Sequence, residues 1–304
     1  MGHANPDMDC FGAALGIHRM CAMSNRDSYI LINEISDSLE DIYRQAKETQ
    51  NYQFIGSKKA ETLVDKDTLV VLVDTHRPSY AEHGELLKMT DKIVVIDHHR
   101  RAADYINPVV VNLHEPYASS ASELVAELIE YAVEKDDVLP IEAKSLLAGI
   151  CLDTKFFNVR TGERTFEAAA ALRRLGADTT EVKLLLQNDF QDTMAKYNII
   201  KASRLYRQEL AIAALYTPTT RVLAAQAADE LLNISGITAS FVLYPDNDRV
   251  IISARSIGTA NVQMILEPLG GGGNTATAGA QIQGITVKDA LDKLVESIDK
   301  YYEQ

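Results

Sequence analysis

The sequence is short of cysteine, of basic side chains and of long apolar runs, and each shortage excludes a class of protein. Its three cysteines, Cys10, Cys21 and Cys151, show none of the paired spacings that hold zinc, and each stands among apolar or small residues. Free cysteines in such surroundings pack in cores, and a reducing, cytosolic compartment suits them. We therefore expect a protein that is stabilised neither by disulfides nor by cysteine-bound zinc.

Basic residues are outnumbered by acidic ones, 30 to 43, which gives a formal net charge of −13 over 304 residues. Such a chain repels the backbone of long DNA or RNA, so we expect no long nucleic acid as a partner. A small nucleotide could still bind in a local basic pocket, and bound divalent cations would offset part of the negative charge. No apolar run in the sequence is long enough to span a bilayer.

The first half alternates β-branched runs with helical segments, a pattern typical of an α/β fold with a parallel sheet. Residues 68–73 (TLVVLV) and 92–96 (KIVVI) predict strands buried on both faces. Helices are predicted over residues 10–23, 121–134 and 165–175.

Beyond residue 188 the pattern changes. Residues 189–208 predict one long helix, and shorter strands with a hairpin near residues 245–248 follow it. We therefore expect a parallel-sheet catalytic domain over residues 1–187, a linker helix over 188–208, and a smaller mixed-sheet α/β domain over 209–304.

The first motif is His3-x-x-x-Asp7-x-Asp9, in which Asn5 and Pro6 favour a loop. A loop can fold three hard ligands around cations, and a carboxylate at a helix start is favoured by the helix dipole. The alternative is a solvated acidic loop with a capping aspartate. An α/β site of this kind usually follows a strand, and the residues before His3 cannot form one. We therefore expect that the chain is a segment of a longer protein.

Three further signals follow apolar runs. Asp74 follows the first buried strand, Asp97-His98-His99 ends the second, and Asp153 closes the apolar stretch 149–153. Open α/β sheets bind ligands at the carboxyl ends of their strands. Adjacent histidines point in different directions, so we expect only one of His98 and His99 to bind a metal. The alternatives are a turn cap for Asp74 and a surface histidine pair.

Taken together, these signals supply two imidazoles and four carboxylates: His3, Asp7, Asp9, Asp74, His98 and Asp153. So many carboxylates in one place would repel one another without cations. The set suits two hard divalent ions, and Mn²⁺ fits mixed oxygen and nitrogen ligation. A two-metal site activates water and stabilises the charge of an in-line phosphoryl displacement.

The second half carries two weaker signals. Arg255 and Ser256 end a predicted strand, and Gly270-Gly271-Gly272-Gly273 precedes Asn274. An arginine can clamp a phosphate with two hydrogen bonds, and glycine backbone amides can approach one closely. The alternatives are a surface salt bridge and a flexible turn.

The motifs 3–9, 73–76, 97–100 and 152–154 resemble the four motifs of the DHH phosphoesterase superfamily, and the glycine run through Ala280 resembles its DHH-associated C-terminal domain. The resemblance covers nearly the whole chain. Residues 153–155, 160–166, 175–178, 253–256 and 261–263 are most similar to the cyclic-di-AMP phosphodiesterase branch.

The resemblance implies a role for each motif. His3 and Asp7 would hold one Mn²⁺, while Asp9, His98 and Asp153 would hold the other, with Mg²⁺ or Co²⁺ as alternatives to manganese. Asp74 would bridge the ions, and His99 would lie beside the scissile phosphate, so that Asp74 and His99 are the catalytic candidates. The implied substrate contacts are Arg255, Ser256, Gly271, Gly272, Gly273 and Asn274. Asn274 stands where many members place a histidine, which makes substrate preference harder to infer than metal binding.

The implied reaction is hydrolysis of cyclic-di-AMP to 5′-pApA by water that two metals activate. A short-oligonucleotide phosphodiesterase acting on pApA or nanoRNA, and a non-catalytic sensor of cyclic dinucleotides, are the alternatives. Members of this branch usually carry membrane helices and regulatory domains upstream. We therefore expect a cytoplasmic segment, attached to the bacterial plasma membrane only through an upstream region. Because the helices expected in the first half expose apolar surface, we also expect a homodimer.

Overall fold

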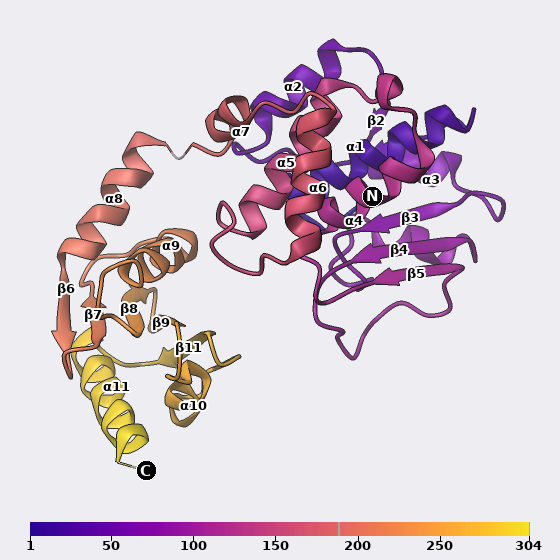
Figure 1. Cartoon of the computed structure of the whole chain (residues 1–304). Coiled ribbons are helices and arrows are strands. Elements are labelled where there is room, and N and C mark those ends of the chain that lie inside the picture. Colours follow the sequence, from indigo (N-terminus) through magenta and orange to yellow (C-terminus); the bar gives the residue numbers. More distant parts are fainter. Residues whose placement is uncertain (188, 304) are drawn as a thin grey trace. The chain divides into compact units, whose positions relative to one another are not determined.

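The computed structural model describes residues 1–187 and 189–303. The chain divides into two compact units, Met1–Gln187 and Asn188–Gln304 (Figure 1). Among the described residues, no helix combines the length and the apolar character needed to cross a bilayer.

The first unit contains two sheets, and all the strand pairs in both are parallel. In the larger sheet β3, β4 and β5 lie side by side (Figure 1), and in the smaller sheet β1 pairs with β2. The bounds are Ile30–Leu31 (β1), Phe54–Ile55 (β2), Val70–Val73 (β3), Ile93–Asp97 (β4) and Val111–His114 (β5). The parallel α/β class expected for this part of the chain is therefore confirmed.

Helices cover this unit. They are Met8–Met23 (α1), Glu40–Glu48 (α2), Ser57–Leu63 (α3), Ala121–Ala132 (α4), Pro140–Asp153 (α5), Glu163–Arg174 (α6) and Thr179–Leu185 (α7), with short 3₁₀ turns at Gly84–Lys88 and Lys135–Asp137. Helices α1, α4 and α5 pack together, and Val73 and Ile96 lie in the same core as their apolar residues. The alternate residues Leu72 and Val95 belong to a second core on the other face. Burial on both faces explains why these strands are continuous β-branched runs.

Two glycines bring α1 and α5 into close contact. A Cβ added at Gly12 would lie 2.6 Å from the carbonyl oxygen of Ser145, and one at Gly149 would lie 2.8 Å from the Cα of Asp9. Because neither position has room for a side chain, the helices approach at their backbones. This contact brings Asp9, near the start of α1, close to the end of α5, where Asp153 stands.

The second unit is built on a mixed six-stranded sheet of order β10-β11-β9-β8-β7-β6, in which only the β7–β8 pair is parallel among the described strands. The strands are Ser203–Tyr206 (β6), Leu210–Ala214 (β7), Ala239–Asp246 (β8), Arg249–Ser256 (β9), Gly272–Gly273 (β10) and Thr277–Gln283 (β11). The helices are Phe190–Lys201 (α8), Arg221–Leu231 (α9), Val262–Leu266 (α10) and Val287–Tyr302 (α11), and a 3₁₀ turn spans Glu267–Leu269.

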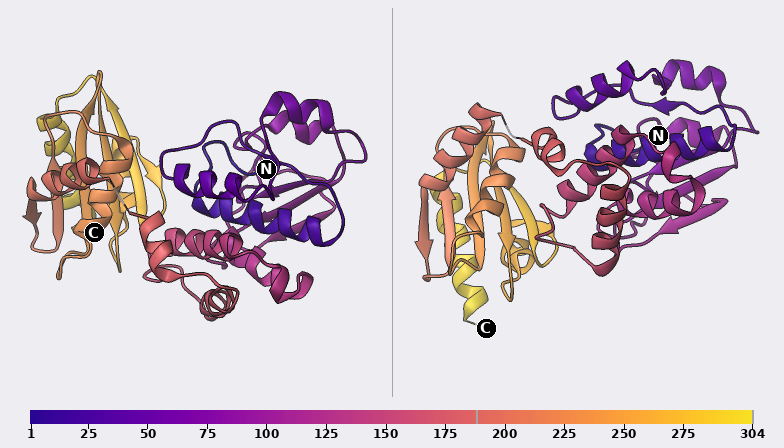
Figure 2. Two further views of the ribbon diagram at one scale, coloured as in Figure 1. Left: turned by 90° about the horizontal axis from the view of Figure 1, so that it is seen from above. Right: turned by 45° about the horizontal axis from the view of Figure 1, so that its top comes forward.

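Alternate residues of these strands enter two different cores. Ala211, Ala213 and Val242 pack with residues of α8 and α9, whereas Ile212 and Phe241 pack with residues of α10 and α11. The sheet is therefore covered by helices on both faces, as the views in Figure 2 allow the reader to follow.

The long helix expected over residues 189–208 is wrong in its second part. Helix α8 ends at Lys201, and residues Ser203–Tyr206 form strand β6, which pairs antiparallel with β7. Arg207 and Gln208, both at positive φ, make the turn between the two strands. Because α8 packs on α9 and buries Ile199 in a core of this unit, it is not a free linker. Asn188 and Gln304, the outermost residues of the expected linker and second domain, lie outside the described residues.

Candidate metal centre

The predicted strand-end residues lie at one edge of the larger sheet. Strands β3 and β4 are in register from Val70–Ile93 to Val73–Ile96, so the residues that follow them stand opposite one another. The amide of Asp74 donates to the carbonyl of Ile96 at 2.9 Å. Polar side chains at this carboxyl edge therefore converge where α/β sheets bind ligands.

Asp74 leaves strand β3 in the left-handed region, with φ of +57°. Aspartate tolerates this conformation better than most residues, and it turns the side chain into the cluster. The side chain is only 3% exposed, and its two oxygens face different partners: Oδ1 lies 3.4 Å from Nε2 of His98, and Oδ2 lies 3.2 Å from Nε2 of His3. Asp74 thus stands between two groups of potential ligands.

The first group comprises His3, Asp7 and Asp74. The loop that carries His3 is anchored to the segment after β3, since Ala4 donates to Tyr80 O at 2.7 Å. Nδ1 of His3 contacts its neighbouring carbonyl, Ala4 O, at 3.0 Å. Because Nδ1 is engaged by this carbonyl, Nε2 is the ring nitrogen that faces the carboxylates, and it has the orientation of a histidine metal ligand.

Asp7 completes the first group and also caps helix α1. Its Oδ1 accepts the backbone amides of Asp9 and Cys10 at 2.9 and 3.1 Å and lies 3.8 Å from Nε2 of His3. The helix therefore begins at Met8, and the capping residue is Asp7. Burial disfavours protonation of His3, but the nearby carboxylates of Asp7 and Asp74 outweigh burial and raise its pKa to about 11.

The second group comprises Asp9, His98, Asp153 and, from its other side, Asp74. Nε2 of His98 lies 3.2 Å from Asp153 Oδ2 and 3.8 Å from Asp9 Oδ2. Asp9 is fully buried, and its carboxylate accepts the amides of Ala121 and Ser122, at the start of α4, at 2.8 and 2.7 Å. The amides fix the carboxylate in place, while each oxygen keeps a second acceptor site.

The buried carboxylates of this second group repel one another. Burial, followed by the nearby charges of Asp74 and Asp153, raises the pKa of Asp9 well above its usual range. Burial also raises the pKa of Asp153, and although the charge of His98 opposes it, the pKa reaches about 6. The same carboxylates outweigh the burial of His98 and raise its pKa to about 9. The cluster therefore favours added positive charge.

Two unpaired atoms of the cluster indicate whether cations would fit there. Among the described residues, Asp74 Oδ1 and His98 Nε2 are buried without any hydrogen-bond partner. Buried polar atoms are rarely left unpaired, and each such atom needs an explanation. Carboxylate and imidazole donors that converge within 4.8 Å are what a divalent cation requires, and both Asp9–His98–Asp153 and Asp74–His98–His99 meet that condition. The residues present fit metal ions.

Cys10 is also near the first group, within ligand range of His3 and Asp74. Burial raises the pKa of its thiol well above the usual range. A protonated, buried thiol is a packing group and not a thiolate ligand, in keeping with the interpretation drawn from the sequence.

Asp97, the last residue of β4, organises a layer of side chains behind the cluster. Its carboxylate is fully buried and binds the Nδ1 atoms of both His76 and His99, the latter at 2.8 Å. Nε2 of His76 accepts the amide of Ala102 at 2.9 Å, so both nitrogens of His76 are engaged. His76 is thereby a neighbour of the cluster and not one of its ligands.

His99 differs from the other histidines because its side chain is 53% exposed. Asp97 accepts from its Nδ1 and from its backbone amide, which leaves Nε2 as the ring atom directed away from Asp97. Burial opposes the hydrogen bond to Asp97, but that bond dominates and raises the pKa of His99. The two adjacent histidines thus lie in different surroundings: His98 is buried among the carboxylates, whereas His99 is at the surface.

Sequence reasoning placed Asp97 at a strand end without giving it a role, and it missed His114 altogether. His114 ends β5 opposite Asp97, its Nε2 contacts the carbonyl of His99, and its ring stacks on His76 with centroids 4.6 Å apart. The rule that polar residues gather at strand ends would have found His114. However, β5 is short and half exposed, so residues 111–114 gave no buried apolar run.

The residues predicted in the second unit lie around the β10–β11 hairpin. Arg255 is opposite Thr277 in the β9–β11 register, and the hydroxyl of Ser256 donates to Thr275 O at 2.9 Å. The guanidinium of Arg255 lies 3.2 Å from the carboxylate of Asp229 and donates to Ala254 O at 2.9 Å. The salt bridge weighed as an alternative for Arg255 is thus present.

The glycine run is not an open loop. Gly272 and Gly273 form strand β10, paired with Gly279 and Ala278. A Cβ added at Gly271 would lie 2.8 Å from the carbonyl of Gly279, and Gly273 has φ of +149° and faces the carbonyl of Thr277. The hairpin itself requires these glycines, and Oδ1 of Asn274 closes its turn by accepting the amides of Ala276 and Thr277.

The fold and the cluster define an α/β protein with potential metal ligands at the carboxyl edge of its parallel sheet and with a second, mixed-sheet unit. Residues 1–150 match the model of the DHH family, N-terminal domain, and residues 208–304 match that of the DHHA1 domain. The chain therefore combines a DHH-family N-terminal domain with a DHHA1 domain.

Two curated relatives align with essentially the whole chain. Cyclic-di-AMP phosphodiesterase GdpP of Bacillus subtilis (strain 168) is 43% identical over 312 residues, which cover 100% of this chain and 47% of that protein. Cyclic-di-AMP phosphodiesterase PdeA of Listeria monocytogenes serotype 1/2a (strain 10403S) is 40% identical over 310 residues, which cover 99% of this chain and 47% of that protein. The chain therefore spans about half the length of these relatives.

Among solved structures, an exopolyphosphatase-related protein from Bacteroides fragilis has the same fold. The TM-score is 0.82 with 18% sequence identity, and the match covers 99% of this chain and 91% of that one. At this identity the likeness concerns the fold alone.

Proposed function

We propose that this chain is the catalytic segment of a phosphodiesterase that hydrolyses cyclic-di-AMP to 5′-pApA. The observation that carries the proposal is the position of Asp74, whose Oδ2 faces His3 and whose Oδ1 faces His98. A carboxylate shared by two groups of ligands suits a pair of metal ions. Two relatives that align with the whole chain at 43% and 40% identity are named cyclic-di-AMP phosphodiesterases, which supports the choice of substrate.

The cluster would hold two Mn²⁺ ions, and Mg²⁺ or Co²⁺ could use the same donors. His3 and Asp7 would hold the first ion, Asp9, His98 and Asp153 would hold the second, and Asp74 would contribute to both. When bound, such ions lower the pKa of water and stabilise the negative charge of the phosphoryl group under attack. The amides of Ala121 and Ser122 keep the carboxylate of Asp9 oriented for this role.

His99 is the candidate general acid. Asp97 holds Nδ1, which leaves Nε2 of the half-exposed ring to carry the transferable proton. In the proposed reaction, water forms the new bond to phosphorus and releases a proton to solvent, while the bond from phosphorus to the ribose 3′ oxygen breaks. That oxygen takes the proton of Nε2, and the imidazole regains a proton from solvent, so that no net proton is gained or lost by the protein. The hydrogen bond to Asp97 raises the pKa of His99, which keeps the proton available near neutral pH.

The second unit contributes the proposed substrate contacts, which are Arg255, Ser256, Gly271, Gly272, Gly273 and Asn274. Arg255 would exchange Asp229 for a phosphate oxygen, since both offer the guanidinium an anionic acceptor. Asn274 supplies an amide where a histidine would supply a cation, so phosphate affinity at this position depends on hydrogen bonding alone.

The same proposal covers the wider organisation. Residues 1–187 form the catalytic domain, residues 209–304 form the substrate-binding domain, and the chain forms a homodimer. Its surroundings are cytoplasmic, and attachment to the bacterial plasma membrane comes through residues outside this segment.

The proposal is tested by comparing kcat/KM of the Mn²⁺-loaded protein for cyclic-di-AMP, cyclic-di-GMP and pApA. We expect cyclic-di-AMP to be the preferred substrate and 5′-pApA to be the first product. Faster turnover of pApA or short oligoribonucleotides would instead identify a short-oligonucleotide phosphodiesterase. Binding of cyclic-di-AMP without hydrolysis of any dinucleotide would identify a sensor and refute the enzyme.

A further inference from the structure

The chain turns sharply after Asp153, the last residue of α5. Lys155, Phe156 and Phe157 follow one another at positive φ, with values of +49°, +56° and +65°. Residues other than glycine rarely adopt this left-handed region, and bulky ones are genuine outliers there. Backbone outliers of this kind cluster at functional sites, where the surrounding structure enforces them. The turn therefore has a cost that a simple connection between two helices does not require.

Thr154 enforces the turn. It is fully buried, and its carbonyl oxygen accepts the amides of Asn158 and Val159 at 2.8 and 3.0 Å. Its hydroxyl oxygen accepts the amide of Phe157 at 3.0 Å. Val159 is thereby held beside the residue that follows Asp153, whereas a continued helix would carry it about 9 Å along the helix axis. The turn thus returns the chain to the end of α5.

The far end of the segment is fixed by helix α6. The ring of Phe157 packs against the core of the first unit and stacks on the ring of Phe166 in α6, with centroids 5.5 Å apart. The amide of Gly162, which precedes the helix, donates to the hydroxyl of Thr165 at 3.0 Å. The segment is therefore held at both ends, and Arg160 lies within it. A side chain on such a preorganised segment loses less entropy when it binds a ligand.

Arg160 is an exposed cation. Most arginines of the first unit form an ion pair with an acidic residue, namely Arg19, Arg44, Arg77, Arg164, Arg173 and Arg174. Among the residues that the structure describes, Arg160 forms none, although acidic side chains outnumber basic ones in this chain. Its charge is still felt by the cluster: burial raises the pKa of Asp153, and the charge of Arg160 is among those that oppose the rise.

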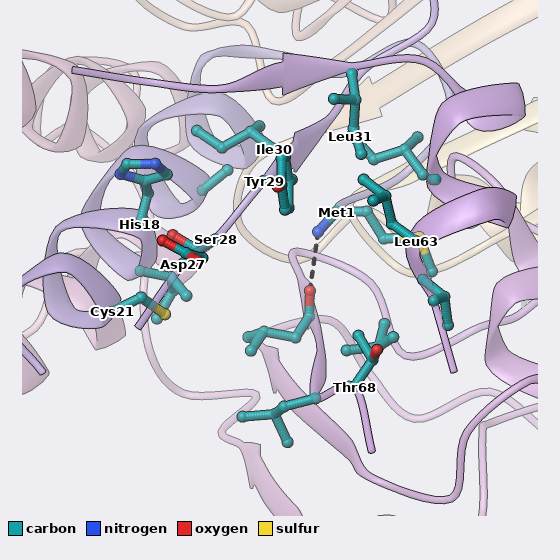
Figure 3. Close-up of a pocket in the computed structure, with 18 of the residues that line it drawn as sticks. Met1, His18, Cys21, Asp27, Ser28, Tyr29, Ile30, Leu31, Leu63 and Thr68 are labelled. Carbon is teal, nitrogen blue, oxygen red and sulfur yellow. Dashed lines mark hydrogen bonds between the residues drawn. The ribbon is translucent and has the colours of Figure 1, made fainter. Parts of the chain in front are cut away.

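A cavity elsewhere in the first unit does not offer an alternative place for the phosphate. This cavity of about 650 Å³ is lined by residues of β1 and β3 and is mainly apolar, as Ile30, Leu31 and Leu63 illustrate (Figure 3). None of the proposed metal ligands, all of which are described residues, lines it. A phosphate needs hydrogen-bond donors close to those ligands, and the segment after Asp153 carries such a donor group in the guanidinium of Arg160.

We propose that Arg160 binds a non-bridging oxygen of the phosphate under attack. The proposal rests on the proposed phosphodiesterase function, in which Asp153 would help to hold the second metal ion. A phosphate oxygen in the surroundings of Asp153 also comes within electrostatic range of Arg160. A guanidinium offers a phosphate two parallel N–H donors. While water bonds to phosphorus and the bond to the ribose 3′ oxygen breaks, a cation that is already in place stabilises the negative charge without reorganisation.

The position of Arg160 gives it opposite effects on cations and anions. Its charge repels a cation held by Asp153 and attracts an anion at the same place. Removing this charge should therefore leave the affinity for Mn²⁺ unchanged or higher while turnover falls. A residue that only held Asp153 in position would instead lower the affinity for Mn²⁺ when replaced. The two roles are thus separated by the direction of the change in metal binding.

Four Mn²⁺-loaded proteins test the proposal: the parent, Arg160→Gln, Arg160→Lys and Arg174→Gln. Arg174 is an exposed arginine of α6, so its replacement controls for the loss of one positive charge from the same unit. Turnover is measured for cyclic-di-AMP and for bis(p-nitrophenyl) phosphate, a diester with one phosphate and no nucleoside. Calorimetry on the metal-free proteins measures the affinity of each for Mn²⁺.

With Arg160→Gln we expect kcat to fall ~10²-fold for both diesters, as for the loss of a group that stabilises charge in the transition state. Arg160→Lys should lie between this variant and the parent, because lysine keeps the charge but lacks the two parallel donors. The affinity for Mn²⁺ should be unchanged or higher in both variants. Arg174→Gln should match the parent in all three measurements.

Unchanged turnover of both diesters by Arg160→Gln would overturn the proposal. A loss confined to cyclic-di-AMP would also overturn it, because Arg160 would then contact another part of the nucleotide. Weaker Mn²⁺ binding that accounts for the lost turnover would show that the turn only supports Asp153. A parent that hydrolyses the one-phosphate diester but not cyclic-di-AMP would refute the proposed substrate alone, and the variants would still be compared on that diester. A parent that hydrolyses neither would refute both proposals.

Discussion

Replacing Asp153 with asparagine should change the stability of the protein in opposite directions without and with metal. Burial raises the pKa of Asp153, and although the charge of His98 opposes it, the pKa reaches about 6, against an ordinary value of 3.8. A shift of roughly two units corresponds to about 3 kcal/mol of unfavourable free energy for the ionised form. Asparagine carries no charge and escapes this cost.

The direction of the change in stability with pH follows from proton binding. The folded protein binds the proton of Asp153 more tightly than the unfolded chain does, so this group lowers stability as the pH rises from about 4 through 6. In chelator at pH 8 we therefore expect Asp153→Asn to raise the free energy of unfolding by up to about 3 kcal/mol. Below about pH 4 the two proteins should be equally stable, because both states are then protonated.

Mn²⁺ should reverse the order of stability, so that the parent becomes more stable than Asp153→Asn. A ligand at one hundred times its dissociation constant stabilises the folded state by about 2.7 kcal/mol, and the variant lacks one proposed ligand. Urea unfolding in chelator and in Mn²⁺ measures both effects, with Asp136→Asn, an exposed aspartate in the turn Lys135–Asp137, as the matched control. A variant that is less stable than the parent in chelator at pH 8, or that gains as much from Mn²⁺ as the parent, would refute the reasoning.

Three further predictions follow from particular contacts. Gly149→Ala places a Cβ 2.8 Å from Asp9 Cα and against Ser122. We therefore expect the free energy of unfolding in urea to fall by ~1–3 kcal/mol and Mn²⁺ binding, measured by calorimetry, to weaken. An unchanged Mn²⁺ affinity would show that the contact between Gly149 and Asp9 does not position a metal ligand. Arg19→Ala removes the guanidinium that lies 2.8 Å from the fully buried Glu142, which should cost ~3–5 kcal/mol, and adding Glu142→Gln should recover part of it; no recovery would show that the loss is one of packing. His99→Gln should lower kcat by ~10²–10⁴-fold with Mn²⁺ content unchanged, whereas lost manganese would make His99 a ligand.

Much of the first unit could be predicted because its signals are local. The runs 68–73 and 92–96 are β-branched and end abruptly in aspartate, so both the strands and the positions of Asp74 and Asp97 followed from the pattern. The approach of Asp9 to Asp153 could not be predicted in the same way. It depends on two glycines that let α1 and α5 touch, and a lone glycine inside a helical pattern has no unique meaning.

The second unit shows where local patterns mislead. The segment SRLY at Ser203–Tyr206 continues a helical pattern, yet it pairs with β7 because the turn at Arg207 and Gln208 returns the chain. The glycines after Leu269 suggested an open loop, but their neighbours in space are Gly279 and Thr277. In both cases the deciding contacts are with strands that the local sequence does not reveal.

The manganese content of the parent protein and of Asp74→Asn, measured by elemental analysis alongside turnover of cyclic-di-AMP, tests the central proposal most directly. Asp74 is the residue whose two oxygens face the two groups of ligands, at 3.2 Å from His3 and 3.4 Å from His98. We predict about two manganese ions per parent chain, with metal and turnover both lost in the variant. A variant that keeps the parent's manganese content and activity would contradict a metal centre organised around Asp74.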